Sequence, residues 1–201
     1  MYFPIIKAGI IKYSVSTYKH PMDPASLVVN RIYIGSIHTA TSADNLHALN
    51  ITKIINLSGV SYPGDIPVTR IDIDDKYVSA RLVPQYMATF AIAVAAIEDA
   101  IASGDTVLVH CAAGINRSAF AIALYMANVG HSFDDIKTCL VEANKRREQP
   151  VMTNSSFEYI LSVYIHGRRA MALRKSALKK MTGMATGVAT GAATGAVTTP
   201  V

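Results

Sequence analysis

Residues 106–118 constrain the fold of this chain more than any other stretch. They begin with an apolar, largely β-branched run (106–109) that predicts a short strand, and after a tight loop they enter an apolar run that predicts a buried helix. A loop between a strand and a helix N-terminus turns successive backbone N–H groups toward one point, where the helix dipole favours negative charge. The sequence therefore predicts a backbone cup for a tetrahedral oxyanion.

Inside this stretch the order His-Cys-x-x-Gly-x-x-Arg-Ser places a nucleophile and a cation around the cup. Cys111 at its base is predicted to be a thiolate, because the amides, the helix dipole and a guanidinium all favour the charged form. Arg117 has the planar fork that grips two phosphate oxygens, and Gly114 lets the loop turn without a Cβ. Ser118 can donate its hydroxyl to the sulfur and make it a better leaving group. The pattern indicates a cysteine nucleophile aimed at a phosphate.

Residues 110–118 resemble the signature of the cysteine-dependent protein phosphatases, and most closely that of their dual-specificity branch. The resemblance covers residues 28–166 and includes Asn154-x-x-Phe157 near its end. It implies hydrolysis of phosphotyrosine and phosphoserine or phosphothreonine through a phosphocysteine intermediate. We expect His110 to support the loop from behind, fixing its backbone and adding positive character near the sulfur. The substrate phosphate would be bound by the loop residues Ala112, Ala113, Gly114, Ile115, Asn116 and Arg117.

The reaction also needs a carboxylic acid, because the leaving oxygen takes up a proton and the hydrolytic water must give one up. Three candidates cluster at Asp72, Asp74 and Asp75. In the family that the chain resembles, the acid lies two residues past the last apolar position of the preceding strand. This position corresponds to Asp75, with Asp74 as the alternative. Asp72 alternates with two isoleucines, so it is predicted to lie on a strand surface.

Short apolar runs and helical periodicities alternate along the chain. This order predicts an α/β fold with a mostly parallel central sheet flanked by helices, followed by a low-complexity C-terminal tail. Ser132 with Asp135, and Ser155 with Glu158, have the spacing of a capping box, and each pair predicts a helix start. The uncharged run 86–97 is too short to span a bilayer and predicts a buried helix. The expected strands are 31–34, 53–57, 68–73 and 106–109, and the expected helices include 43–49, 82–102 and 118–129.

The resemblance implies a catalytic domain at 28–166, preceded by an N-terminal arm (1–27), and composition separates a basic segment (167–180) and an Ala/Thr/Gly tail (181–201) after it. The net charge of +5 belongs to the basic segment, because six of the 19 basic residues follow the last acid, Glu158. The other 13 stand against 14 acids. The apolar arm packs either on its own domain or on a second copy, which would make the chain a homodimer.

The tail repeats a four-residue unit that brings glycines into G-x-x-x-G register, a pattern found in dimerising membrane helices. Ala, Thr and Gly are too weakly hydrophobic to drive insertion, and residues 181–201 contain no Leu, Ile or Phe. The sequence therefore predicts a disordered low-complexity tail, and a membrane is not expected as a partner. The basic segment is predicted to be a solvated helix end, with contact to anionic lipid or nucleic acid left open.

Several features bear on the substrate. The chain has no Trp, so it lacks the Trp-Pro-Asp acid loop of the larger tyrosine-specific phosphatases. The variable loop positions carry no charge, which disfavours a phosphoinositide. Two alternatives stay open. One is an RNA 5′-triphosphatase of the same superfamily. Asn116 and the basic segment favour it, whereas Ala112, Ala113 and Ser118 depart from its pattern. The other is a catalytically weak phosphopeptide-binding module.

The expected partner is a phosphorylated protein, and no nucleic acid or cofactor is expected. No metal is needed, because the cup and Arg117 supply the charge stabilisation. The only cysteines are Cys111 and Cys139, which argues against a disulfide scaffold and favours a reducing compartment. We expect a cytoplasmic location, with the nucleus also allowed. Cys139 lies on an apolar helix stripe with Ile136 and Leu140, so a core position is favoured over a resolving thiol.

Overall fold

The computed structural model describes residues 24–188, and the side chains of residues 24–177. Its five-stranded sheet has the order β1-β2-β5-β3-β4, in which β1 is antiparallel to β2 and the other neighbours are parallel. The predicted α/β fold with a mostly parallel sheet is confirmed. The strands are β1 Ser26–Val29, β2 Ile32–Gly35, β3 Lys53–Asn56, β4 Val68–Arg70 and β5 Val107–His110.

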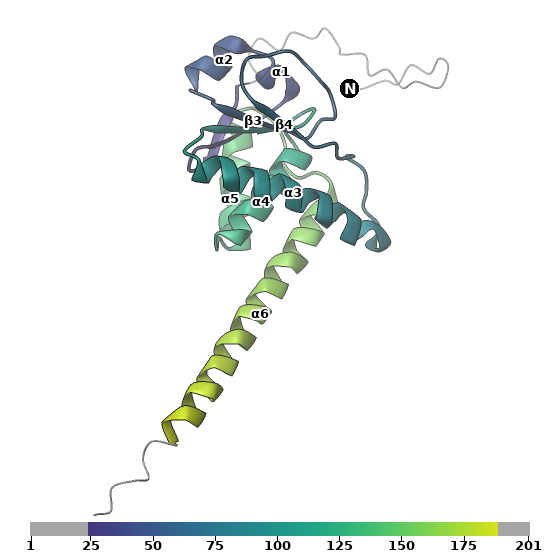
Figure 1. The fold of residues 1–201 in the computed structure, drawn as a ribbon. Coiled ribbons are helices and arrows are strands. Elements are labelled where there is room, and N and C mark those ends of the chain that lie inside the picture. The colour runs from purple at the N-terminus through teal and green to yellow at the C-terminus, as the bar shows by residue number, and fades with distance from the viewer. Residues whose placement is uncertain (1–23, 189–201) are drawn as a thin grey trace, which may run out of the picture.

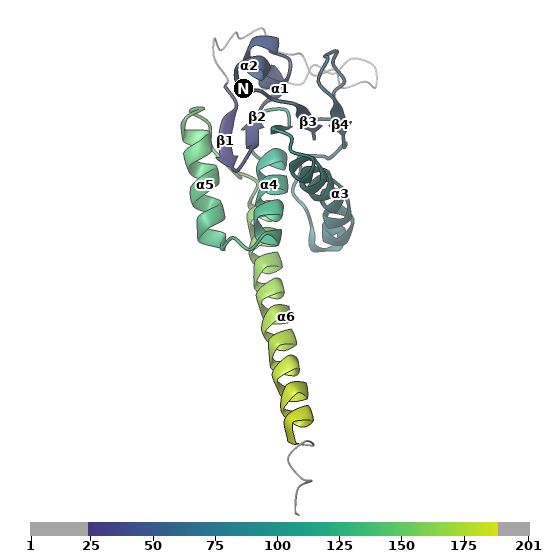
Figure 2. The ribbon, with the colours of Figure 1, turned by 60° about the vertical axis from the view of Figure 1, so that its left-hand side comes forward.

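Helices cover both faces of the sheet, α1 and α2 on one side and α3, α4 and α5 on the other, with α6 packed on α4 (Figure 2). The reason lies in the central strands β2, β5 and β3, most of whose residues are buried on both faces. In β5, Leu108 packs with the small cluster under α1 and α2, whereas Val107 and Val109 join the larger core. The helices are α1 Ile37–Ala40, α2 Ala43–Ala48, α3 Val83–Ala102 after a 3-10 turn at Ala80–Leu82, α4 Arg117–Asn128, α5 Phe133–Lys145 and α6 Ser155–Val188.

Helix α4 forms the centre of the larger core, because all ten side chains from Ser118 to Ala127 are buried. Three aromatic rings join it to its neighbours. Phe120 of α4 meets Phe90 of α3 edge-on, with ring centroids 4.7 Å apart, and stacks on Phe157 of α6 at 4.9 Å. The predicted oxyanion loop directly precedes α4, so this packing anchors one end of the loop.

The stretch Ala80–Ala102 is long and apolar enough to cross a membrane by length and composition, with a mean hydropathy of 1.4. In the fold, however, α3 is a core helix. It buries one face, centred on Phe90, Val94 and Ile97, in the larger core. The buried helix predicted over 82–102 is confirmed, and its periodic face is the one that packs.

Strand β4 is shorter than the predicted 68–73 and ends at Arg70. The alternation of apolar residues continues because Ile71 and Ile73 are buried, but only the Ile71 N–H still bonds to β3, through the carbonyl of Asn56. Beyond this point the neighbouring strand has ended. Asp72 is therefore an exposed loop residue and not the strand residue that the sequence predicts.

The two predicted capping boxes have different outcomes. Ser132 and Asp135 form theirs at the start of α5. At α6 the box of Ser155 and Glu158 is wrong, because Asn154 caps the helix: its side-chain oxygen accepts from the backbone N–H and the hydroxyl of Ser156, at 3.2 and 2.6 Å. Glu158 instead accepts from Lys137 of α5 at 2.8 Å.

Helix α6 continues far beyond the body of the domain (Figure 1). It runs through the basic segment, where residues 166–177 are all exposed, in agreement with a solvated helix end. It then continues to Val188, so the prediction of disorder is wrong for residues 181–188. Residues 189–201 lie outside the described part of the chain. So do residues 1–23, on which the homodimer hypothesis rests.

Candidate active site

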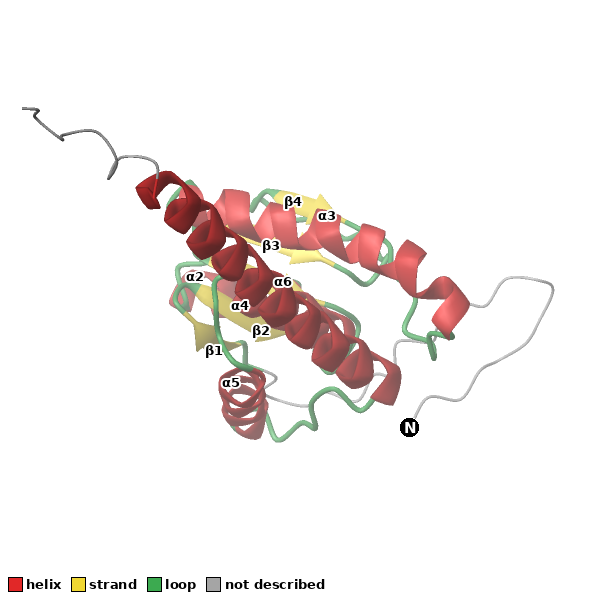
Figure 3. Cartoon of the chain, turned by 90° about the horizontal axis from the view of Figure 1, so that it is seen from below, coloured by secondary structure: helices red, strands yellow, loops and turns green. Residues whose placement is uncertain are grey.

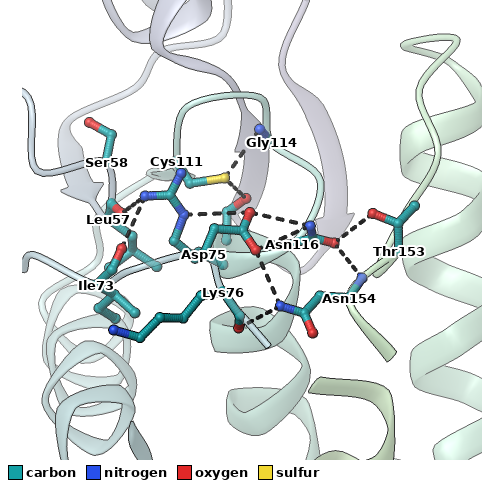
Figure 4. A network of polar contacts seen from close by, with 12 residues as sticks. Leu57, Ser58, Ile73, Asp75, Lys76, Cys111, Gly114, Asn116, Thr153 and Asn154 are labelled. Carbon is teal, nitrogen blue, oxygen red and sulfur yellow. Dashed lines mark hydrogen bonds and ion pairs between the residues drawn. The ribbon is translucent and has the colours of Figure 1, made fainter. Parts of the chain in front are cut away.

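The loop of residues 111–116 connects the carboxyl end of β5, the central strand, to the first turn of α4. Ligands of parallel α/β sheets bind at this edge. Cys111 opens the loop, with a side chain that is 1% exposed. Its Sγ accepts from the backbone N–H of Gly114 at 3.3 Å and lies 3.4 Å from the hydroxyl of Ser118 (Figure 4).

The surrounding structure holds the carbonyl groups of this loop from outside. The carbonyl of Ala112 accepts from the Ile37 N–H at 3.2 Å, and that of Ile115 accepts from the Met152 N–H at 2.9 Å. Arg147, 4% exposed, donates to the carbonyls of Ala113 at 3.1 Å and Gly114 at 2.9 Å. With four successive carbonyls bonded outward, the N–H groups of the loop can face an anion beside Cys111, and that of Gly114 already donates to the sulfur.

Gly114 is required by the shape of this loop. Its φ of +71° lies in the left-handed region, which side chains disfavour. A Cβ at this position would also lie 2.5 Å from both the carbonyl oxygen of Gly35 and Nη1 of Arg147. Position 114 therefore has no space for a side chain, and the close approach of Arg147 depends on that.

The pKa of the Cys111 thiol is lowered from its ordinary value. Burial is the largest single influence and opposes ionisation. The charge of Arg117, the Ser118 hydroxyl, and the backbone N–H groups of Ser118 and Ile115 together outweigh it. The site therefore favours the nucleophilic thiolate.

Arg117, in the first turn of α4, is held by carbonyl groups of two neighbouring loops. Its Nη1 donates to Leu57 at 3.1 Å and to Ile73 at 3.0 Å. Its Nε is buried and has no hydrogen bond within the described residues, and it lies 3.8 Å from a carboxylate oxygen of Asp75. The guanidinium thus has a fixed orientation and an N–H available for an anion.

The structure separates the three candidate acids. Asp75 is 29% exposed and faces Arg117, with its carboxylate held by the side-chain N–H groups of Asn116 at 3.2 and 3.3 Å (Figure 4). Asp74 is 68% exposed and pairs with Lys76 at 2.7 Å. Asp72 is exposed in the loop after β4. Only Asp75 comes next to the residues of the cup.

Asn154 belongs to the site, although the sequence did not predict a role for it there. Its side chain donates to Asp75 at 3.4 Å and to the Lys76 carbonyl at 2.9 Å, so it ties the acid loop to the start of α6. Its backbone N–H and the Thr153 hydroxyl both donate to the side-chain oxygen of Asn116, at 3.1 Å each. The available signal was the Asn154-x-x-Phe157 pattern, but nothing in it indicated contact with an acid.

His110 is completely buried, and burial, helped by the nearby charge of Arg117, lowers its pKa to about 4 despite a bond to the Cys111 carbonyl. The expectation of positive character is therefore wrong, because a neutral ring is cheaper to bury. The expectation that the ring fixes the backbone agrees with the structure: Nδ1 lies 3.2 Å from the Cys111 carbonyl oxygen.

The other ring nitrogen of His110 is 2.7 Å from the hydroxyl of Tyr62, a partner that the sequence did not indicate. Burial raises the pKa of Tyr62 to about 12, so its hydroxyl keeps its proton. Tyr62 therefore donates to Nε2, and Nδ1–H donates to the Cys111 carbonyl.

Arg147 is a further residue that the sequence did not indicate as part of the site, because it ends the basic run Lys145-Arg146-Arg147. The first two side chains are exposed, and only the third is buried beneath the loop. Asn144 supports the same Gly114 carbonyl at 3.2 Å. Within the described residues, no group of three or more His, Cys, Asp or Glu side chains could hold a metal ion.

Comparisons with known proteins agree with this geometry. The family model "Dual specificity phosphatase, catalytic domain" matches residues 32–166. Protein 123R of Invertebrate iridescent virus 6, whose name assigns it to the tyrosine phosphatases, is 31% identical over 137 residues, which are 68% of this chain and 87% of the relative. Dual specificity protein phosphatase MPK-4 of Drosophila melanogaster is 30% identical over 59% of this chain, which spans 31% of that protein.

Solved structures share the fold. A mouse dual specificity phosphatase complexed with zinc tungstate is 26% identical, with a TM-score of 0.61 over 79% of this chain and 97% of that one. A human tyrosine phosphatase-like serine/threonine/tyrosine-interacting protein is 21% identical, with a TM-score of 0.58 over 76% of this chain and 99% of that one. The family match covers more than half of the chain and includes the whole loop around Cys111. The chain therefore belongs to the dual-specificity phosphatase family of cysteine-dependent enzymes.

Proposed function

We propose that this chain removes phosphate from phosphotyrosine and from phosphoserine or phosphothreonine in proteins, with Cys111 as the nucleophile. The observation that carries the proposal is the environment of the Cys111 sulfur. It is buried in a loop whose carbonyl groups are bonded outward, and its pKa is lowered by Arg117, Ser118 and N–H groups of the loop. Family membership supports a phosphorylated protein as the substrate.

In the first step the Cys111 thiolate attacks phosphorus, and the bond from phosphorus to the leaving oxygen breaks. Asp75 gives its proton to that oxygen, so the protein side chain leaves as a neutral hydroxyl. The loop N–H groups and Arg117 bind the three remaining phosphate oxygens as charge builds up on them. The products of this step are the dephosphorylated protein and a phosphocysteine.

In the second step the Asp75 carboxylate takes a proton from a water molecule, and the water oxygen attacks phosphorus. The sulfur–phosphorus bond breaks, inorganic phosphate leaves, and Cys111 returns to the thiolate. The Ser118 hydroxyl, 3.4 Å from Sγ, stabilises the departing sulfur. Asn116 and Asn154 keep Asp75 in place through both steps.

The two alternatives differ from this proposal in what the loop residues do. An RNA 5′-triphosphatase was favoured by Asn116, but here this side chain bonds Asp75, Thr153 and Asn154, all within the chain. A binding module is compatible with the fold, which a phosphatase-like interacting protein shares. Catalysis is supported by the presence of Cys111, Arg117 and Asp75 in one site.

The leaving group offers the sharpest test of the acid. In assays without added metal, Cys111→Ser is expected to abolish hydrolysis of every substrate. Asp75→Asn is expected to lower kcat on a phosphotyrosine peptide about 10²-fold or more, and to affect p-nitrophenyl phosphate less, because that leaving group needs little protonation. Asp74→Asn, one residue away, is the matched control and should retain activity.

The contrary outcomes are clear. Equal losses in Asp74→Asn and Asp75→Asn would mean that the loop, and not one carboxylate, matters. No turnover by the wild type, together with phosphopeptide binding, would favour the binding module. Release of phosphate from 5′-triphosphate RNA alone would favour the triphosphatase.

We also propose that the reaction takes place in a reducing compartment, the cytoplasm or nucleus. Cys111 and Cys139 are both free thiols, and the mechanism requires Cys111 to remain reduced.

A further inference from the structure

The second half of helix α6 is exposed. Arg168 still donates to the side chain of Asn128 in α4 at 3.0 Å, but beyond it the helix forms no hydrogen bond or ion pair with another element among residues 24–177. Among its side chains up to residue 177, the last buried one is Ile165, and residues 166–177 are all exposed. Seen from below, the helix crosses α4 and then leaves the body of the domain (Figure 3). A helix that is exposed on every side loses the packing that usually stabilises helices, so a binding partner would stabilise this one.

The charge of this half restricts the partner. Six basic residues follow Glu158, with no acid among them, within a stretch of about 20 Å at the rise of an α-helix: Arg168, Arg169, Arg174, Lys175, Lys179 and Lys180. A partner is therefore expected to be anionic. A second copy of the helix placed alongside would bring the same positive charge, which disfavours a homodimer along α6.

A stripe of apolar side chains runs along the outer side of α6. We call it the outer stripe: its members are three, four or seven residues apart, which places them on one face of a helix, with His166 on the same face between them. Its large members are well exposed, Tyr159 at 70%, Val163 at 54% and Leu173 at 72%. The side chains that face the core, Phe157, Leu161 and Ile165, lie on the opposite face. The outer stripe consists of Tyr159, Val163, Ala170, Leu173 and Ala177.

Two arginines border the stripe. By the 100° turn of each residue, Arg169 lies on one side of Leu173 and Ala170, and Arg174 lies on the other. This is the arrangement of a helix that rests on a lipid surface, with apolar side chains in the bilayer and arginines that reach back to the headgroups. Nucleic acid would be bound through its phosphates by the basic side chains, and this binding would leave the apolar stripe exposed.

We propose that α6 binds the surface of an anionic phospholipid membrane, with the outer stripe buried between the headgroups. The contact is peripheral and differs from the spanning anchor that the Ala/Thr/Gly tail is too weakly apolar to form. It departs from the expectation that a membrane is no partner and takes up the open alternative of contact with anionic lipid, because the basic segment and the apolar positions share one continuous helix. The proposal does not depend on the catalytic mechanism.

The first test is sedimentation of the full chain with vesicles of phosphatidylcholine, with or without 30% phosphatidylserine by composition. We expect binding to the mixed vesicles only. Each basic side chain near an anionic surface contributes about five-fold to the binding constant, so the triple variant Arg169→Gln, Arg174→Gln, Lys175→Gln should bind about 100-fold more weakly. The control triple variant Arg81→Gln, Lys145→Gln, Arg146→Gln removes the same charge from other exposed positions and should bind as the wild type does.

The apolar stripe is tested separately. The variant Val163→Ser, Leu173→Ser should lose most of the vesicle binding, whereas Ile92→Ser, Val141→Ser, which changes exposed apolar residues on α3 and α5, should not. Unchanged hydrolysis of p-nitrophenyl phosphate by each variant shows that the domain remains folded.

Because the chain has no Trp, a single introduced Trp reports on one position. Leu173→Trp should shift its emission to shorter wavelength on mixed vesicles and be quenched by brominated lipid. Ala172→Trp, the next residue but on another face, should do neither.

Three results would overturn the proposal. The first is absence of binding by the wild type to the mixed vesicles. The second is binding that survives the loss of Val163 and Leu173 and that double-stranded DNA displaces, which would identify a general polyanion site. The third is a dimer in sedimentation equilibrium that Leu173→Lys dissociates, which would assign the stripe to a second copy.

Discussion

The charge on Cys111 depends on a few neighbouring groups. Burial of the thiol opposes ionisation, and Arg117 supplies the largest opposing influence, ahead of the hydrogen bonds from Ser118 and the loop. The side chain of Arg117 is only 11% exposed, so solvent screens its charge weakly. The guanidinium therefore has two functions, as a stabiliser of the free thiolate and as a ligand for phosphate.

Replacing Arg117 should separate these two functions. Arg117→Met is expected to raise the pKa of Cys111, while Arg117→Lys keeps a charge and should raise it less. Both should weaken phosphate binding, because neither offers a planar fork. The thiolate can be titrated by its ultraviolet absorbance, with Cys111→Ser as the blank. An unchanged titration in Arg117→Met would show that the loop N–H groups alone hold the charge.

His110 links the site to the pH dependence of stability. Its folded pKa of about 4 is below the ordinary value of 6.5, so the unfolded chain binds the extra proton first as the pH falls. The contribution of His110 to the free energy of unfolding is therefore fully present above pH 6.5. It is lost as the pH falls toward 4, and the loss is about 3 kcal/mol at most. Urea unfolding at several pH values should show this slope, and His110→Asn should show less of it. Equal slopes would assign the acid sensitivity to other groups.

At the scale of elements, the connection between α5 and α6 shapes the loop between β5 and α4. Arg147 and Met152 of this connection bind three of the loop carbonyls. The Arg147 guanidinium also fills the space that Gly114 leaves open. The cup is therefore built by a segment more than 30 residues away in sequence.

Arg147→Met is expected to leave the carbonyl of Ala113 without its donor, at a cost of about 1–3 kcal/mol, and to leave that of Gly114 with the bond from Asn144 alone. The loop should then bind anions less well, seen as weaker inhibition by inorganic phosphate and a higher KM. Arg146→Met changes the exposed neighbour and serves as the control. If inorganic phosphate inhibits both variants equally, the support from Arg147 is not needed for anion binding.

At the scale of the whole molecule, one aromatic cluster joins the helices that carry the site. Phe157 is completely buried and contacts Phe90 of α3 and Phe120 of α4. It lies three residues after Asn154, which holds the acid loop. Core packing and the position of Asp75 thus depend on the same start of α6.

Phe157→Ala should lower the free energy of unfolding by about 3–5 kcal/mol, the usual cost of removing a buried Phe. Tyr159→Ala, two residues later and 70% exposed, should change it by less than about 0.5 kcal/mol. Urea denaturation of both variants measures the difference. Similar values would mean that the start of α6 contributes little to the core.

The sequence by itself determined the loop and its direct neighbours. Cys111, Arg117 and Ser118 belong to one strand–loop–helix unit, so their spacing alone brings them together. The elements with clear periodicity, such as α3 and α4, were also predictable, because a helix shows its buried face in its own sequence. β4 and the cap of α6 were placed wrongly, since both depend on what a neighbouring segment offers.

Only the tertiary structure decided which acid faces the site and which side chains hold it. Asp75 and Asn154 are 79 residues apart, Tyr62 and His110 are 48 apart, and Arg147 lies 34 residues from Ala113. Such contacts arise from the packing of α4, α5 and α6 on the sheet, and no local pattern records them. The same is true of α6, whose exposed stripe exists only because the helix continues past the domain.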